Sequence, residues 1–171
     1  LRTGFRRLSE KMNAIFRRQT AILSPDHPAE LLQHYIEVLT SRSAPKEFAL
    51  AHMKENRRSE ADIANLLSLL EGQKYRMYMF TSCGWFFADL AGIEPVQNIR
   101  YALKALYLYT QFTDDDLFEE LAADLESARS NTADQETGRD ILTREAALWQ
   151  KDGVEAASYF FIRRLIYKEN E

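Results

Sequence analysis

Apolar residues recur at helical spacing from the first residue of the chain onward, and this periodicity constrains the fold more than any other feature. In the first segment they are Leu1, Phe5, Leu8, Met12, Ile15, Phe16 and Leu23. The alternation of apolar and polar residues that is typical of half-buried strands is absent from the sequence. Six glycines and four prolines in 171 residues also favour long helices over a turn-rich sheet. We therefore expect an all-α fold.

Cap and breaker residues divide the chain into seven to eight predicted helices of a single domain, 1–171. Pro28 suits a first helical turn, and Ser43, Ser59 and Thr113 stand in predicted N-cap positions. We expect Ile36 and Leu39 to face inward from the second helix. The predicted helices span about 1–23, 28–40, 43–53, 59–80, 94–112, 113–128, 139–150 and 153–167.

The helix predicted over 94–112 has apolar residues around most of its circumference. Its polar positions form one narrow stripe, made of Gln97, Arg100, Lys104 and Gln111. A helix that is apolar on most sides is covered on most sides. We expect it to lie at the centre of the domain, with the other helices packed around it.

Composition excludes several classes of protein. Hydrophobic residues at 46% and charged residues at 28% are the balance of a soluble globular protein, and no apolar run is long enough to span a bilayer. A net charge of −4 argues against a dedicated nucleic-acid binder. One cysteine cannot form an internal disulfide. We expect a cytoplasmic protein without membrane or nucleic-acid partners, and a first residue other than Met indicates a piece of a longer protein.

The first 18 residues carry a strongly basic helix face. Its members are Arg2, Arg6, Arg7, Lys11, Arg17 and Arg18. A phosphate-binding face is one interpretation. The commoner one is a solvated face that pairs with the acidic stretch at 114–120 or with an acidic patch of another domain.

Histidine and cysteine provide little evidence for catalysis. His27, His34 and His52 show no metal-ligand spacing with Cys, Asp or Glu, so we expect neither a metal nor another cofactor. Cys83 is predicted to be a buried structural residue. A nucleophilic Cys83 would need a base and an orienting group, which the sequence alone does not supply.

Helical periodicity fails in one apolar segment, 81–93, which holds two glycines among aromatic residues. We expect this loop to be buried or ligand-facing. Phe86 and Phe87 fit either a core or a ligand role, whereas Trp85, flanked by Gly84, has the backbone freedom to project. An indole suits stacking on a sugar ring while its N–H donates to a hydroxyl. Asp89 is predicted to make a polar contact or to neutralise Arg100.

The run from Tyr78 to Tyr101, with its core Thr81-Ser82-Cys83-Gly84-Trp85-Phe86-Phe87, resembles the domain of unknown function 3536 family. That family lies downstream of glycoside hydrolase family 57 type catalytic domains. The resemblance implies a bacterial protein whose preceding barrel acts on alpha-linked glucans or related sugars. In related branching enzymes a helical domain closes over the cleft and contributes a tryptophan, and Ser82-Cys83-Gly84-Trp85-Phe86 is similar to part of that segment.

Two functions remain as alternatives. In the first, the domain is not catalytic alone and completes a carbohydrate cleft on the upstream barrel. Its predicted substrate-binding residues are Trp85, Asp89, Gln97, Arg100 and Cys83. In the second, it is a structural or protein-interaction module whose aromatic loop never meets sugar. The partners that these interpretations allow are the barrel of the same chain, an oligosaccharide and a second copy of the chain.

Overall fold

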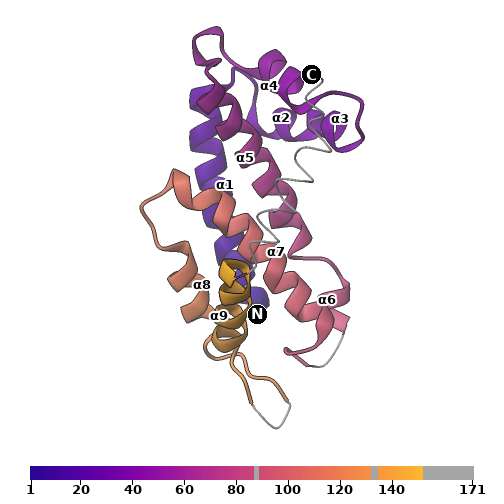
Figure 1. The fold of residues 1–171 in the computed structure, drawn as a ribbon, viewed down its shortest axis with the longest axis vertical. Helices are drawn as coiled ribbons and strands as arrows, with labels where there is room; N and C mark the ends of the chain where they lie inside the picture. Colours follow the sequence, from indigo (N-terminus) through magenta and orange to yellow (C-terminus); the bar gives the residue numbers. More distant parts are fainter. Residues whose placement is uncertain (87–88, 132–134, 152–171) are drawn as a thin grey trace.

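The computed structural model describes residues 1–86, 89–131 and 135–151 of the chain (Figure 1). Within these residues the regular structure is helical apart from one isolated antiparallel bridge between Arg129 and Thr137, so the predicted all-α fold is confirmed. The helix predicted over 153–167 lies outside the described residues. The elements are α1 (Arg2–Leu23), α2 (Pro28–His34), α3 (Ile36–Leu39), α4 (Pro45–His52), the 3₁₀ turn η1 (Glu55–Arg57), α5 (Glu60–Tyr78), α6 (Cys83–Phe86), α7 (Ile93–Tyr109), the 3₁₀ turn η2 (Thr110–Phe112), α8 (Leu117–Leu125) and α9 (Gly138–Lys151).

Helix α7 forms the centre of the fold, as its apolar circumference predicts. It packs along α5 and also contacts α1, α6, α8 and α9 (Figure 1). Ile99 and Leu103 on one side of it and Leu108 on the opposite side are almost completely buried. The close approach of α5 and α7 depends on Gly72, because a Cβ atom there would overlap the ring of Tyr109.

A buried polar network joins α1, α5 and α7. The Tyr109 hydroxyl donates to the Leu69 carbonyl at 3.0 Å and accepts from the Gln73 amide at 2.8 Å. Arg76 donates to the Gln73 side-chain oxygen at 2.6 Å and to the Ser9 hydroxyl at 2.8 Å. Burial raises the pKa of Tyr109 and lowers that of Arg76. Each polar group in this part of the core therefore has a partner.

The helix predicted over 28–40 is interrupted at Tyr35. The Tyr35 ring is buried, packs edge-on against Phe48 and donates its hydroxyl to Glu71 at 3.1 Å. Ile36 and Leu39, which were expected to face inward, are 55% and 43% exposed. The helix therefore breaks where the Tyr35 ring packs into the core, and the residues after the break do not keep the inward orientation that a continuous helix would give them.

Two of the three predicted N-caps are wrong. Ser59 caps α5 by accepting from the Asp62 backbone N–H at 3.1 Å, as expected. Ala44 occupies the N-cap position of α4, and the Ser43 hydroxyl points instead to the Ala44 carbonyl at 3.4 Å. Helix α8 begins at Leu117 with Asp116 as its side-chain cap, so Thr113 belongs to the preceding loop.

The basic face of α1 pairs with acidic residues around α8, as one interpretation of the sequence predicts. Lys11 lies 3.5 Å from Asp115 and also pairs with Glu120, and Arg7 pairs with Asp124. Apart from Asp124, which is half-buried, these side chains are exposed, so each pair contributes about 1 kcal/mol to stability or less.

Candidate functional site

The segment between α5 and α7 folds as a short loop around the one-turn helix α6. Gly84 is buried, and a Cβ atom there would overlap the Asn98 side chain. Asn98 is 1% exposed; its amide donates to the Thr81 carbonyl at 3.1 Å and its oxygen accepts from the Thr81 hydroxyl at 2.7 Å. The glycine is therefore required by the close contact of α6 with α7, rather than for freedom of the neighbouring tryptophan.

Trp85 is half-buried and packs inside this loop. Its indole N–H donates to the Phe80 carbonyl at 3.2 Å. The ring lies edge-on to Phe5 with centroids 6.0 Å apart, stacks near Phe80 at 6.4 Å, and has the Arg2 guanidinium 5.7 Å from its centroid. The indole N–H was expected to be available for a sugar hydroxyl. In the structure it is already used in the hydrogen bond that holds α6 against the end of α5.

The outer side of α6 is apolar and exposed. Phe86 is 85% exposed, and Ile93, the first residue of α7, is 83% exposed. Cys83, predicted to be buried, is also exposed, because it lies three positions before Phe86 and shares its side of the helical turn. Phe87 lies outside the described residues. We call Cys83, Phe86 and Ile93 together the α6 tip.

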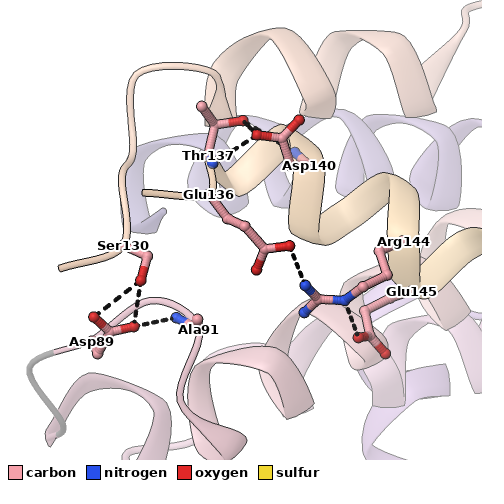
Figure 2. A network of polar contacts seen from close by, with 8 residues as sticks. All are labelled: Asp89, Ala91, Ser130, Glu136, Thr137, Asp140, Arg144 and Glu145. Atoms are coloured by element: carbon pink, nitrogen blue, oxygen red, sulfur yellow. Dashed lines mark hydrogen bonds and ion pairs between the residues drawn. The ribbon is translucent and has the colours of Figure 1, made fainter. Parts of the chain in front are cut away.

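Asp89 holds the loop before α7 against a distant turn (Figure 2). Its carboxylate accepts from the Ala91 backbone N–H at 2.7 Å, from the Ser130 hydroxyl at 2.9 and 3.1 Å, and from the Asn131 backbone N–H at 2.7 Å. These hydrogen bonds, that from Ala91 first, hold the pKa of Asp89 below its ordinary value. Of the two alternatives predicted for Asp89, the structure therefore shows polar contacts, made within the fold, and not an ion pair with Arg100.

Arg100 instead pairs with a buried carboxylate on α9. Its Nε donates at 2.7 Å to Glu145, which is 3% exposed. Arg144 lies between Glu145 and Glu136, with its Nε 3.5 Å from the Glu145 oxygen (Figure 2). Its hydrogen bond to Glu136 raises the pKa of Arg144. Arg100 thus serves mainly to fix α9 on α7.

The remaining predicted residue, Gln97, is half-buried on α7, four positions after Ile93 and therefore on the same side of the helix. The predicted residues thus separate into two groups. Trp85 and Asp89 hold the loop from within and Arg100 fixes α9 on α7, whereas Cys83 and Gln97 lie on or beside the exposed tip. Phe86 and Ile93 replace Trp85 as the prominent apolar side chains of this region.

Sequence reasoning missed the partners of these residues. Ser130 and Glu145 lie 41 and 45 positions from Asp89 and Arg100, so no local pattern relates them. One missed feature had a local signal. Thr137 and Asp140 form a reciprocal cap at the start of α9, in which Thr137 Oγ1 accepts from the Asp140 N–H at 3.1 Å and Asp140 accepts from the Thr137 N–H at 2.8 Å (Figure 2).

The chemistry available at the α6 end is that of a contact surface. Its carboxylates at Asp89 and Glu145 are hydrogen-bonded within the fold. In the described parts of the chain, no three or more His, Cys, Asp or Glu side chains are placed to hold a metal. None of the helices described is long and apolar enough to cross a membrane.

Comparison with known proteins supports the resemblance seen in the sequence. No curated protein and no solved structure matches the chain. The profile of one family, described as "Domain of unknown function (DUF3536)", matches residues 1–171. Because this match covers the whole sequence, it establishes to which family the chain belongs. The chain belongs to the DUF3536 family.

Proposed function

We propose that the chain is a non-catalytic helical domain that packs through the α6 tip on a glycoside hydrolase family 57 type catalytic barrel, in a bacterial cytoplasmic protein, and so helps to enclose a carbohydrate cleft. The observation that carries this proposal is the exposure of Phe86 and Ile93 on a loop whose base is firmly held. The barrel itself is proposed from the resemblance of residues 78–101.

The structure of the loop favours docking over a freely moving loop. Asn98 fixes the backbone of Thr81, Trp85 is hydrogen-bonded to Phe80, and Asp89 is tied to Ser130. An exposed aromatic side chain on a preorganised base can bind a partner without a large ordering cost. Exposed apolar side chains held in this way are typical of interaction sites.

The single cysteine offers a direct test of coverage. Cys83 is exposed on the α6 tip, so in the 171-residue chain iodoacetamide should alkylate it at a rate close to that of a free thiol. In a longer chain that carries the barrel, we expect alkylation of the peptide containing Cys83 to be at least about tenfold slower, because docking excludes the reagent. Equal rates, measured by mass spectrometry, would show that the tip is not covered.

Substitutions identify the side chains that make the contact. Phe86→Ser and Ile93→Ser should restore rapid alkylation of Cys83 in the longer chain while leaving the thermal stability of the 171-residue chain unchanged. Tyr107→Ser is the matched control: Tyr107 is 70% exposed on the same helix as Ile93. It lies 14 positions further along, roughly 21 Å away along the helix axis, and its replacement should have no effect on the rate.

Contact with sugar is a second candidate function, favoured by the exposed ring of Phe86. An aromatic face can stack on a pyranose ring, and here it belongs to Phe86 rather than to Trp85. In the protein with its barrel, Phe86→Ala should lower glucan affinity without unfolding the domain. Trp85→Ala should instead destabilise the isolated domain by about 3 kcal/mol, the lower end of the range for large aromatics. A stable Trp85→Ala variant with reduced glucan affinity would return the sugar role to Trp85.

A further inference from the structure

An open groove of about 690 Å³ lies at the other end of the α5–α7 pair from the α6 tip. It is bounded by the last turns of α1, by η1, by the first turns of α5 and by η2 with the loop that follows it. Its volume is in the range of small-molecule sites in proteins. Its lining residues include Arg18, Gln19, Arg57, Asn65, Phe112 and Asp114.

The walls of the groove are held by contacts between elements. Arg18 donates to the Phe112 carbonyl at 3.0 Å, which joins α1 to η2. Lys54, just before η1, donates its backbone N–H to the Leu23 carbonyl at 3.0 Å and its ammonium to the Ala21 carbonyl at 2.6 Å. The groove is therefore formed before any ligand arrives, which reduces the ordering cost of binding.

The charges of the lining disfavour an anion or a metal as ligand. Two guanidinium groups, Arg18 and Arg57, face three carboxylates, Asp62, Asp114 and Asp115. The formal charges of these five groups sum to −1, so the lining exerts no net electrostatic attraction on a phosphate. A metal would need a cluster of ligating groups, and the described residues contain none.

The apolar part of the lining disfavours a lipid or other apolar ligand. Phe112 and Leu23 contribute to the groove but are only 9% and 4% exposed, and Ile22 is the one lining apolar side chain with larger exposure, at 43%. The accessible surface of the groove is therefore mainly polar. A neutral ligand with many hydrogen-bonding groups matches it best.

Four lining side chains retain their hydrogen-bonding capacity. Within the described parts of the chain, Gln19, Arg57, Asn65 and Asp114 make no side-chain hydrogen bond or ion pair to other residues. Two amides, a guanidinium and a carboxylate supply donors and acceptors in planar groups. Such groups can bridge the adjacent hydroxyls of one sugar ring.

We propose that this groove binds a neutral oligosaccharide through Gln19, Arg57, Asn65 and Asp114. The site is separate from the α6 tip and does not depend on docking to a barrel. The groove can therefore be tested without the barrel, because the 171-residue chain contains all of its lining residues.

The test is an NMR titration of the 171-residue chain with maltotriose, cellotriose and, separately, inorganic phosphate. Saturable shift changes at Gln19, Arg57 and Asn65 are expected with at least one of the two sugars and not with phosphate. Arg57→Ala and Asn65→Ala should each weaken the sugar affinity by about tenfold. Arg58→Ala, an exposed neighbour outside the groove, and Phe86→Ala at the α6 tip should change it by less than about twofold.

Several results would overturn the proposal. Absence of saturable shifts with both sugars would do so, as would sugar binding that Arg57→Ala and Asn65→Ala leave unchanged while their spectra show the native fold. Saturable binding of phosphate in place of sugar would also reject a neutral ligand.

Discussion

Gly72 on α5 lies directly against the aromatic ring of Tyr109 on α7. Alanine is a better helix former than glycine by about 1 kcal/mol, but its methyl group would overlap this ring. We expect Gly72→Ala to lower the free energy of unfolding by about 1–3 kcal/mol, as overpacking does in cores. Urea denaturation measures the change, with Ser68→Ala on the same helix as a control expected to stay within about 0.5 kcal/mol. An unchanged Gly72→Ala variant would contradict the close packing.

Asp89 predicts a specific dependence of stability on pH. Its hydrogen bonds, that from the Ala91 N–H first, hold its pKa in the folded state below the ordinary value of an aspartate, so its ionised form favours folding. This contribution is fully present above that ordinary value and is lost as the pH falls through the lower, folded-state pKa. Asp89→Asn should therefore be less stable than the wild type at neutral pH, and the difference should disappear in acid.

Denaturant midpoints measured across the acid range for both proteins check this prediction. Asp114→Asn is a suitable control, because Asp114 is exposed and its carboxylate has no hydrogen-bonding partner in the described part of the chain. A stability difference between Asp89→Asn and the wild type that stays constant from neutral to acid pH would show that the charge of Asp89 does not stabilise the loop.

At the scale of elements, the caps of α4 and α5 provide a paired test. Ser59 accepts from the Asp62 N–H, so Ser59→Ala should cost about 1 kcal/mol of stability. Ser43 precedes α4 but does not cap it, so Ser43→Ala should change stability by less than about 0.5 kcal/mol. Denaturant midpoints of the two variants compare them directly, and equal losses would indicate that Ser43 caps α4 in solution.

The helices could be predicted from the sequence because their signals are local. Periodicity places α1, α5 and α7 within a few residues of their observed ends, and the Ser59 cap follows from its spacing to Asp62. The break at Tyr35 could not be predicted in the same way. It depends on Phe48 and Glu71, which a pattern confined to residues 28–40 does not include.

The sequence identifies the segment that forms the candidate site, but not which of its side chains point outward. The failure of periodicity at 81–93 correctly marks an irregular segment, but which aromatic side chain points outward depends on packing. Gly84 lies against Asn98, and Trp85 then fills the space beside Phe5. A one-turn helix in that register leaves Phe86 outside, and no property of the isolated loop distinguishes these two neighbouring rings.

For the molecule as a whole, the network of Ser9, Arg76, Gln73 and Tyr109 couples three helices in the core. Tyr109→Phe removes the partner of the buried Gln73 amide and the Leu69 carbonyl, and should cost about 1–3 kcal/mol. Gln73→Leu should also destabilise, because Tyr109 and Arg76 each lose a hydrogen bond. The double variant should lose less stability than the sum of the two single variants. Thermal or urea unfolding of all four proteins measures this coupling, and strict additivity would show that the two side chains act separately.

The two proposed surfaces lie at opposite ends of the α5–α7 pair, and they differ in chemistry. The α6 tip is apolar, whereas the groove beside η2 is polar and carries both signs of charge. A domain docked through the tip would therefore keep the groove accessible. The central helix pair fixes the separation of the two surfaces, since its core is closely packed over its length.

The hydrogen bonds between Asp89 and the turn at Ser130 constrain which substitutions related chains accept at these two positions. The carboxylate has two backbone donors, Ala91 and Asn131, that any sequence supplies, but its third donor is the Ser130 side chain. Loss of the acid at position 89 would break the hydrogen-bonded contact between this carboxylate and the hydroxyl at position 130. Among descendants of a common ancestor, replacements at these two positions should therefore arise together more often than chance allows.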